Sequence, residues 1–240
     1  MYRVDKILSI SGMSRSDARR YIAAGRVSVQ GRVVRDPGVK ANAEDVCLDG
    51  QPVQVKEKVY LMMNKPAGVV TSTEDPRWPT VLSLLPKTYA RRKIGPIGRL
   101  DRDVTGLVIL CDDGDLVHRI IAPQHRIDKV YRAECAGELT EADVRAFSEG
   151  LDLKEFVCRP AKLEILEVGK TRSTALVTLT EGKFHQVKRM FAAVGHPIEK
   201  LSRVSIGPVT LDPALEEGQA RELTEEETAA LRAAAYGSDE

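Results

Sequence analysis

The spacing of apolar residues at the start of the chain predicts two short helices followed by a hairpin. Residues 4–11 (VDKILSIS) place their apolar side chains on one helical face. Residues 14–25 (SRSDARRYIAAG) open with a Ser-x-x-Asp capping signal and stop at a glycine. Residues 26–34 (RVSVQGRVV) alternate apolar and polar positions on both sides of Gln30-Gly31, a pattern typical of a tight hairpin. We expect these elements to form one small unit.

A polar segment at residues 51–59 (QPVQVKEKV) has the composition of a linker, and a second unit follows it. In this unit the pattern predicts strands at 60–64, 68–72, 106–111, 129–135, 161–168, 174–182 and 203–211, and helices at 80–86, 113–123, 140–150, 184–195 and 223–235. Hairpins with interspersed helices favour an α+β fold with a mixed, largely antiparallel sheet over a doubly wound array. We therefore divide the chain into an N-terminal domain at 1–55, a larger domain at 56–232 and a polar tail at 233–240.

The composition, with 42% hydrophobic and 30% charged residues among 240, is that of a globular protein with a sizeable core. The longest apolar runs are far shorter than the ~20 residues that span a bilayer, and the N-terminus lacks the apolar stretch of a secretion signal. We expect a cytoplasmic protein. The four cysteines stand singly and the four histidines form no H-E-x-x-H pattern, so the sequence suggests neither disulfides nor a metal site.

Charge is distributed unevenly along the chain. Residues 1–40 carry nine Lys and Arg against three Asp and Glu, whereas residues 211–240 carry two against nine. A basic N-terminal segment suits a protein that holds a polyanion at that end, and the acidic C-terminal segment is more simply a solvated helix. The basic segment includes Arg15, Arg19, Arg20, Arg26 and Arg32. A solvated surface would explain any one of these arginines, but five with a single acid among them favour contact with phosphates.

The N-terminal arrangement RVDKILSISGMSRSDARRYIAAGRVSVQGRVV resembles the S4 RNA-binding domain. The match covers about the first fifty residues. This resemblance implies that the N-terminal domain grips structured RNA.

The segment IGPIGRLDRDVTG at 94–106 places Asp101 between Arg99 and Arg102 inside a glycine-punctuated bend. One interpretation is an aspartate that caps a turn or pairs with a neighbouring arginine on the surface, where such pairs contribute little to stability. The other is a carboxylate kept ionised for chemistry, because a nearby cation favours the charged form. This stretch alone favours the first interpretation, since structural ion pairs outnumber catalytic ones.

Three patches of the second unit, GRLDRDVTGLVIL, DKVYRAE and EGKFHQVKRMF, each have a structural explanation when taken singly. In this order, with MMNKPAGVVTSTEDPRWPTV upstream, they resemble the motifs of the pseudouridine synthases. More narrowly, the sequence is similar from residue 1 to about 230 to the RsuA-type branch. That branch couples an S4 domain to the catalytic domain and modifies small-subunit ribosomal RNA.

The resemblance implies roles for three residues. Asp101 falls on the catalytic aspartate of the family, Tyr131 on its active-site tyrosine and Lys183 on the basic residue that pairs with the aspartate. Many relatives carry arginine at the last position. Lysine keeps the charge but lacks the planar fork of arginine, so we expect simple charge pairing between Lys183 and Asp101.

The chemistry of pseudouridine formation suits these groups. The reaction detaches uracil from C1′ of its ribose, turns it and rejoins it through C5, with loss of the C5 proton. An ionised carboxylate serves such a sequence as nucleophile or as base, and an aromatic ring with a hydroxyl stacks on the base and helps to move a proton. Neither a redox change nor a metal is required, and we expect no cofactor.

Further residues are expected to hold the RNA, because the target uridine must leave its stack to reach Asp101, at a cost of a few kcal/mol. The candidates are the five N-terminal arginines, Arg99 and Arg102 beside the aspartate, and Lys188 and Arg189 in the helix at 184–195. For Lys188 and Arg189 the alternative is a plain basic helix face.

The favoured function is a synthase that isomerises a specific uridine in small-subunit ribosomal RNA. We expect a monomer that acts on ribosomal RNA or on a small-subunit assembly intermediate, away from membranes. The segment TSTEDPRWPTV and the compact length favour this substrate over large-subunit RNA, which related S4-bearing synthases modify. A non-catalytic RNA-binding or ribosome-assembly factor is the alternative from a different class, and the intact Asp101, Tyr131 and Lys183 count against it. A small-molecule nucleoside enzyme would have no use for a basic N-terminal domain.

Overall fold

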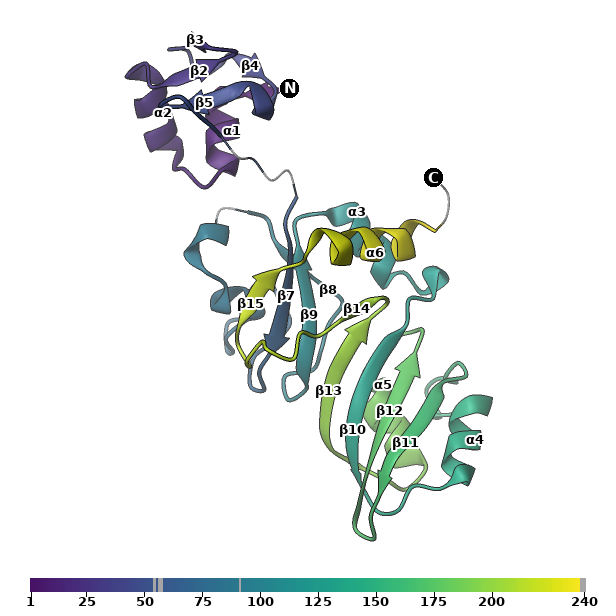
Figure 1. The fold of residues 1–240 in the computed structure, drawn as a ribbon. Coiled ribbons are helices and arrows are strands. Elements are labelled where there is room, and N and C mark those ends of the chain that lie inside the picture. Colours follow the sequence, from purple (N-terminus) through teal and green to yellow (C-terminus); the bar gives the residue numbers. More distant parts are fainter. Residues whose placement is uncertain (54, 56–57, 91, 238–240) are drawn as a thin grey trace. The chain divides into compact units, whose positions relative to one another are not determined.

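The chain divides into two compact units (Figure 1). The computed structural model describes residues 1–53, 55, 58–90 and 92–237. The first unit comprises residues 1–59 and 86–93, and the second comprises residues 60–85 and the chain from Ile94 onward. No helix in the described part of the chain is long and apolar enough to cross a membrane.

Two helices supply most of the core of the first unit. Helix α1 (Val4–Ile10) and helix α2 (Arg15–Ala23) lie where the sequence predicts them. At the start of α2, Ser14 Oγ accepts a 2.8 Å hydrogen bond from the Asp17 backbone N–H, which confirms the predicted cap. The core is made of Val4, Ile7, Leu8, Ala18, Ile22, Val27, Ala41 and Val46.

Short strands complete the first unit. Strands β2 (Val27–Val29) and β3 (Arg32–Val33) form the predicted hairpin, with positive φ at Gln30 (+50°) and Gly31 (+77°) as two-residue hairpin turns require. The other pairs are β2 with β5 (Val46–Leu48), β5 with β6 (Gln51–Pro52), and β1 (Tyr2–Arg3) with β4 (Lys40–Ala41); a 3₁₀ turn, η1, covers Ala43–Asp45. The linker expected from residue 51 is wrong at its start, because Gln51 and Pro52 extend the sheet. Residues 54, 56 and 57 of that segment lie outside the described residues.

A mixed sheet forms the frame of the second unit. Its strands are β7 (Tyr60–Lys65), β8 (Gly95–Ile97), β9 (Thr105–Cys111), β10 (Lys129–Ala136), β11 (Lys162–Val168), β12 (Arg172–Leu179), β13 (Ile198–Ile206), β14 (Val209–Thr210) and β15 (Ala220–Glu222). The order is β11-β12-β10-β13-β9-β7-β15, with β14 beside β13 and β8 beside β9. The β9–β13 pair is parallel and the other strand pairs are antiparallel, so the predicted α+β fold with a largely antiparallel sheet is confirmed.

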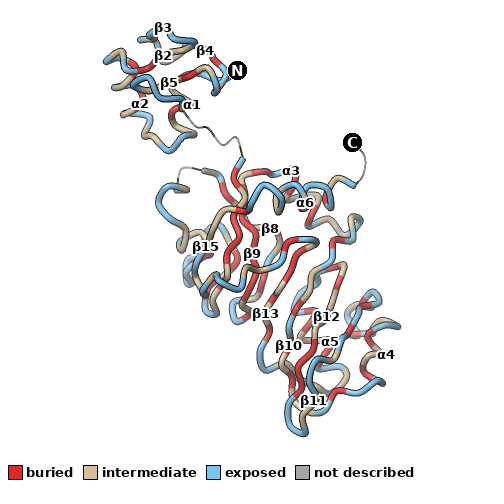
Figure 2. The backbone as a smooth tube through the Cα atoms, viewed as in Figure 1, coloured by how far each residue is buried: buried red, intermediate tan, exposed pale blue. Residues whose placement is uncertain are grey.

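Helices cover this sheet in two groups (Figures 1 and 2). The helices are α3 (Gly114–Ile121), α4 (Glu141–Glu149), α5 (Gln186–Ala193) and α6 (Glu225–Tyr236), with 3₁₀ turns at η2 (Val81–Leu84) and η4 (Pro123–His125); a further 3₁₀ turn, η3 (Lys87–Tyr89), belongs to the first unit. Helices α3 and α6 bury Leu116 and Leu231 against Leu107 and Ile109 of β9. Helices α4 and α5 meet through Phe147 and Phe191, whose rings are 5.2 Å apart at 69°.

Several element boundaries differ from the prediction. Residues 68–72 form a single bridge from Val70 to Thr80 in place of a strand, and residues 80–86 form a 3₁₀ turn in place of an α-helix. Strand β8 lies in the segment interpreted as a bend. Helix α6 runs to Tyr236 because Leu231 and Ala235 are buried, so the tail expected from residue 233 begins inside a helix.

Candidate active site

Asp101 lies in the turn that leads from β8 into β9. The buried Thr71 side chain holds this turn from the amino-terminal side, because Thr71 Oγ1 donates to the Leu100 carbonyl at 3.0 Å and accepts from the Leu100 N–H at 3.1 Å. The Asp101 carbonyl accepts from the Val104 N–H at 3.2 Å, and Gly98 supplies a φ of +73°. These hydrogen bonds fix the backbone on which the carboxylate is presented.

A buried lysine holds the carboxyl-terminal side of the same turn. Lys65, the last residue of β7, has an exposed fraction of 0%. Its ammonium donates to the carbonyls of Pro66 (2.9 Å), Arg102 (3.2 Å) and Val104 (2.7 Å). Burial lowers the pKa of Lys65 to about 8, and the negative charges of Asp103 and Asp101 oppose this decrease. Two of the three acceptors lie within three residues of Asp101, so Lys65 determines where that residue sits.

The Asp101 carboxylate is paired with residues from the α5 region. Lys188 Nζ lies 3.0 Å from Asp101 Oδ2, and His185 Nε2 lies 3.6 Å from Asp101 Oδ1. Lys188 also donates to both oxygens of Asp103, at 2.7 and 2.9 Å. Burial lowers the pKa of Lys188, but hydrogen bonds to Asp103 and Asp101 outweigh it and the pKa is raised. The carboxylate of Asp101 is 29% exposed, which leaves it open to a ligand.

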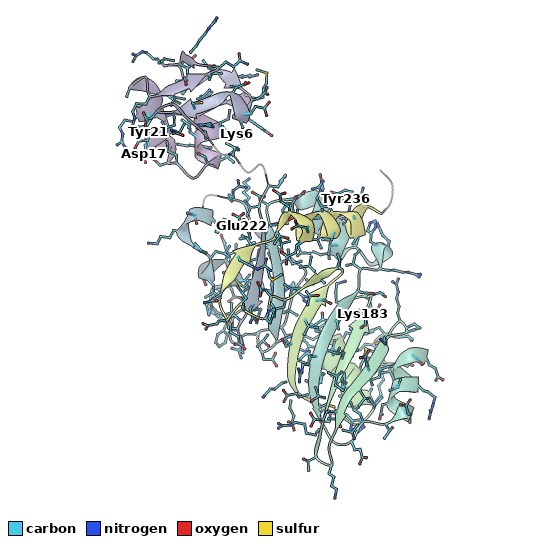
Figure 3. The ribbon with its side chains drawn as sticks, viewed as in Figure 1. Lys6, Asp17, Tyr21, Lys183, Glu222 and Tyr236 are labelled. Atoms are coloured by element: carbon cyan, nitrogen blue, oxygen red, sulfur yellow. The ribbon has the colours of Figure 1, made fainter. Side chains whose placement is uncertain are left out.

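The expected pair between Lys183 and Asp101 is wrong, because Lys188 holds that position. Lys183 lies on the second unit (Figure 3), in the turn before α5, and its ammonium donates to the Val157 carbonyl at 2.8 Å and lies 3.5 Å from Glu181 Oε2. The Gln186 side chain accepts from the Lys183 backbone N–H at 3.0 Å and thereby fixes this turn. Lys188 follows inside the helix, so it is the lysine that reaches the Asp101 turn.

Tyr131 is placed at the same level of the sheet as the Asp101 turn by strand register. Tyr131 of β10 pairs with Arg203 of β13, and Arg203 pairs with Gly106, the second residue of β9. The Tyr131 ring is 8% exposed, and the Arg203 guanidinium carbon lies 6.0 Å from its centroid. The Tyr131 strand β10 and the strand β9 that follows the Asp101 turn therefore lie on either side of β13, which carries a buried arginine.

Arg203 combines full burial with an incomplete set of hydrogen bonds. Its exposed fraction is 1%, its Nε donates to the Leu107 carbonyl at 2.8 Å, and its Nη2 has no hydrogen-bond partner among the described residues. A Cβ at Gly106 would lie 2.3 Å from the Arg203 carbonyl. Only glycine permits this close approach of β9 and β13, which brings the Asp101 turn beside the strand that faces Tyr131.

The other basic residues predicted to touch RNA have different surroundings. Arg99 is exposed, and Arg102 lies over the Trp78 ring with its guanidinium carbon 3.8 Å from the ring centroid. Arg189 pairs with Glu155 at 3.1 Å, which places it on the side of α5 that faces residues 153–156. Arg189 therefore has a structural partner, whereas Arg99 and Arg102 face solvent.

The N-terminal arginines predicted to touch RNA are all exposed. Arg20 pairs with Asp17 at 2.7 Å, and Arg26 forms a two-pronged pair with Asp49 while it lies 4.2 Å from the Tyr21 ring centroid (Figure 3 labels Asp17 and Tyr21). Ion pairs reduce the charge that these two residues offer to a phosphate. Arg15, Arg19 and Arg32 have no ion pair among the described residues.

Sequence reasoning missed four residues of this site: Lys65, Trp78, His185 and Arg203. Lys65 and Trp78 stand in the motif MMNKPAGVVTSTEDPRWPTV, which contributes to the family resemblance without assigning a role to either residue. His185 has a φ of +50° at the start of α5. A buried arginine in RVSIGPVTL gives no signal in the sequence, because a strand arginine is ordinarily exposed.

Three of the four cysteines are buried, and the described residues form no cluster suited to a metal ion. Cys111, Cys135 and Cys158 are buried, Cys47 is partly buried, and burial raises the pKa of Cys135 and of Cys158. In the part of the chain that the structure describes, no group of three or more His, Cys, Asp or Glu side chains could hold a metal ion. The partly exposed Asp101 carboxylate, with an ammonium at 3.0 Å, is the group suited to act as nucleophile or base.

Comparison with known families identifies both units. A model of the RNA pseudouridylate synthases matches residues 59–193, and a model of the S4 domain matches residues 3–47. The chain belongs to the RNA pseudouridylate synthase family. The expectation of an isomerase that acts on RNA is thereby confirmed, as is the predicted order of S4 domain and synthase domain.

Similar synthases match nearly the whole chain. The ribosomal small subunit pseudouridine synthase A of Escherichia coli (strain K12) is 42% identical over 95% of this chain and 99% of its own length. An uncharacterized RNA pseudouridine synthase of Bacillus subtilis is 40% identical over 94% of this chain and 96% of its own length. A crystal structure of a pseudouridylate synthase, 38% identical, covers 96% of this chain and 100% of its own with a TM-score of 0.68.

Proposed function

We propose that this synthase converts one specific uridine of small-subunit ribosomal RNA to pseudouridine. The observation that carries the proposal is the extent of the similarity to the Escherichia coli ribosomal small subunit pseudouridine synthase A. A relative that shared only the catalytic domain would not indicate which RNA this protein modifies. Similarity at 42% identity over 95% of this chain includes the S4 domain, and it supports a shared class of substrate.

In this proposal Asp101 is the catalytic carboxylate. The bond between C1′ and N1 of uridine breaks, the uracil turns, a bond between C1′ and C5 forms, the C5 proton leaves and N1 ends with a proton. Asp101 acts as nucleophile or as base in this sequence, and the ammonium of Lys188 at 3.0 Å favours its charged form. Tyr131 stacks on the uracil and helps to move the C5 proton.

RNA binding is assigned to two sets of exposed arginines, one in the N-terminal unit and one beside Asp101. The exposed N-terminal arginines, above all Arg15, Arg19 and Arg32, hold phosphates, while Arg99 and Arg102 contact RNA beside the target. These contacts recover the few kcal/mol that unstacking of the uridine costs. We further propose that the enzyme acts as a monomer in the cytoplasm, on ribosomal RNA or on a small-subunit assembly intermediate.

Mapping of pseudouridine in ribosomal RNA from cells with and without the gene tests this function. We expect one site in small-subunit RNA to disappear and to return when the wild-type gene is supplied, but not when the Asp101→Asn variant is supplied. Loss of a site in large-subunit RNA would establish the alternative substrate. Unchanged pseudouridine in both RNAs, with a defect in ribosome assembly that Asp101→Asn repairs, would establish a non-catalytic assembly factor.

A further inference from the structure

An exposed aromatic and guanidinium pair lies next to the catalytic aspartate. Trp78, the single tryptophan of the chain, is 46% exposed. Arg102, which directly follows Asp101, is also exposed and stacks on the Trp78 ring at 3.8 Å from the centroid. Aromatic side chains ordinarily bury about 150–250 Å² each, and this burial stabilises the fold. A half-exposed indole beside a catalytic group therefore indicates a ring that binds a ligand.

The loop that carries Trp78 is held in a defined conformation. The Asp75 carboxylate accepts from the backbone N–H groups of Arg77 and Trp78, at 2.8 and 2.9 Å. Beyond the loop, the N–H of Val70 donates to the Pro79 carbonyl at 2.9 Å. Residues 73–79 are nevertheless exposed. The ring is thus presented to solvent by hydrogen-bonded backbone.

The same loop is tied to the turn that bears Asp101. Thr71, at the base of the loop, makes its two hydrogen bonds to Leu100. The Arg102 carbonyl accepts from the Gly68 N–H at 2.8 Å and from Lys65 Nζ at 3.2 Å. Both residues of the Trp78–Arg102 pair are therefore held in place relative to the Asp101 carboxylate. Thr71 holds the loop that carries Trp78, and the hydrogen bonds to the Arg102 carbonyl hold Arg102.

We propose that Trp78 and Arg102 form a subsite that stacks an unpaired nucleotide adjacent to the target uridine. This inference rests on the proposed function, since it concerns the RNA that reaches Asp101. An aromatic face stacks any base, and a guanidinium held over the ring is free to bind the neighbouring phosphate through its N–H groups. The exposed side chains of Arg77 and Arg99 add positive charge around the pair, which suits RNA rather than a neutral or basic protein.

The subsite gives a physical role to the neighbour of the flipped base. When the target uridine leaves its stack, an adjacent base loses a stacking partner, and the indole ring replaces that partner. A fully paired strand cannot offer such a base without further melting. The subsite therefore selects RNA in which the residue next to the target is already unpaired.

The single tryptophan provides a direct test through its fluorescence. The Asp101→Asn protein, which retains Trp78 and is expected not to turn over, is titrated with a hairpin RNA whose loop holds the target uridine and with a fully paired duplex of the same sequence. We expect saturable quenching with the hairpin and little change with the duplex. Equal quenching by both RNAs, or a constant signal at saturation with the hairpin, would overturn the subsite.

Substitutions measure the contribution of the ring to affinity. Trp78→Ala should weaken binding of the hairpin by about 5- to 100-fold, as expected when one base loses the aromatic ring on which it stacks. Trp78→Phe should restore most of the lost affinity. Leu166→Ala is the matched control. Leu166 is 47% exposed on β11, and three strands separate β11 from β9, the strand that follows the Asp101 turn. This substitution should leave affinity unchanged. Hairpin binding of wild-type strength by Trp78→Ala would also overturn the subsite.

Failure of the subsite and failure of the proposed function give different results. If the wild-type protein forms pseudouridine on small-subunit RNA but Trp78 fluorescence does not change when RNA binds, only the subsite is contradicted. Quenching of Trp78 by the hairpin in a protein that forms no pseudouridine would remove the proposed function and leave the subsite.

Discussion

The ammonium of Lys188 lies 3.0 Å from Asp101 Oδ2, and the same ammonium donates to both oxygens of Asp103. One cation from α5 thus compensates two carboxylates of the turn before β9. The pKa of Asp103 is lowered by its hydrogen bond from Lys188. Because the Lys188 side chain is 26% exposed, solvent screens this cluster only in part. The arrangement couples the position of α5 to the charge of the Asp101–Asp103 turn.

Lys188→Met should therefore lower kcat by about 10²-fold or more, since it removes the positive charge beside Asp101 and leaves two like charges in one turn. The measurement is single-turnover pseudouridine formation on saturating RNA. Lys188→Arg keeps the charge and should retain much of the rate.

Lys183→Met is the comparison that separates the two lysines. Lys183 donates to the Val157 carbonyl and lies near Glu181, so its removal should loosen the turn before α5 and change the rate only several-fold. A greater decrease of kcat in Lys183→Met than in Lys188→Met would contradict the assignment of Lys188 as the partner of Asp101.

The sequence predicted the elements with strong local signals. Helix α2 carries a cap at Ser14, α6 carries a capping box from Thr224 to Glu227, and the β2–β3 hairpin turns at Gln30-Gly31. In each case residues close in sequence determine the structure. The family resemblance likewise points to Asp101 through a contiguous motif, and the structure places that carboxylate 3.0 Å from the Lys188 ammonium.

The remaining features depend on partners far apart in sequence. Strand β8 pairs with β9 through Ile97 and Ile109. It has three residues, too few to show a periodicity that would predict a strand. Whether Lys183 or Lys188 reaches Asp101 depends on where α5 begins, and that boundary is set by the hydrogen bond of Gln186 to Glu181 at 2.6 Å. Tertiary interactions decide such boundaries, so the motif match alone assigned the pairing to Lys183, which contacts Val157 and Glu181 instead.

Removal of the Lys65 ammonium should disturb the Asp101 turn. Lys65→Met leaves the buried Val104 carbonyl without this donor, whereas the Arg102 carbonyl keeps its hydrogen bond from the Gly68 N–H; one unsatisfied buried group costs about 1–3 kcal/mol. We expect the free energy of unfolding in urea to fall by about that amount and kcat to fall with it. Lys129→Met is the control, because Lys129 is a partly buried lysine that donates to the Ile127 carbonyl and not to the turn. An equal decrease of kcat in both variants would contradict a positioning role for Lys65.

The pH dependence of stability should also report on Lys65. Its pKa is about 8 in the folded protein and 10.5 ordinarily, so between these values the unfolded chain binds more protons. Stability contributed by this group therefore rises as pH increases from about 8 to 10.5. The difference in unfolding free energy between wild type and Lys65→Met should grow in favour of wild type over this range. A difference that stays constant from about pH 8 to 10.5 would show that the folded pKa is not lowered.

Tyr131→Phe should separate stacking from proton transfer. The ring is 8% exposed and phenylalanine fills the same space, so RNA binding should persist. If the hydroxyl is the acid or base, single-turnover rates should fall by up to ~10²- to 10⁴-fold. Tyr60→Phe is the matched control, because the Tyr60 hydroxyl donates to Asp113 at 2.6 Å in the core beside α6. It should reduce stability and not turnover. Weak RNA binding by Tyr131→Phe would make Tyr131 a docking or structural residue.

The basic N-terminal unit makes a prediction about salt. If Arg15, Arg19 and Arg20 contact phosphates, their replacement by alanine should weaken RNA binding largely irrespective of sequence. The slope of log K against log salt should flatten by roughly 0.7–0.9 for each phosphate that is no longer neutralised. Arg20 already pairs with Asp17, so Arg20→Ala alone should change the slope less than Arg15→Ala or Arg19→Ala.

The fold of the triple variant should be preserved, because Ala18 and Ile22 form the buried face of α2 and alanine is the better helix former. Turnover at saturating RNA should change far less than affinity, since phosphate binding is shared by the ground and transition states and acts on KM more than on kcat. Arg145→Ala, on the exposed side of α4, should leave the salt slope unchanged. A triple variant with the wild-type slope on the same RNA fragment would mean that the arginines are a solvated face. The RNA would then be held by the second unit, where Arg99 and Arg102 flank Asp101.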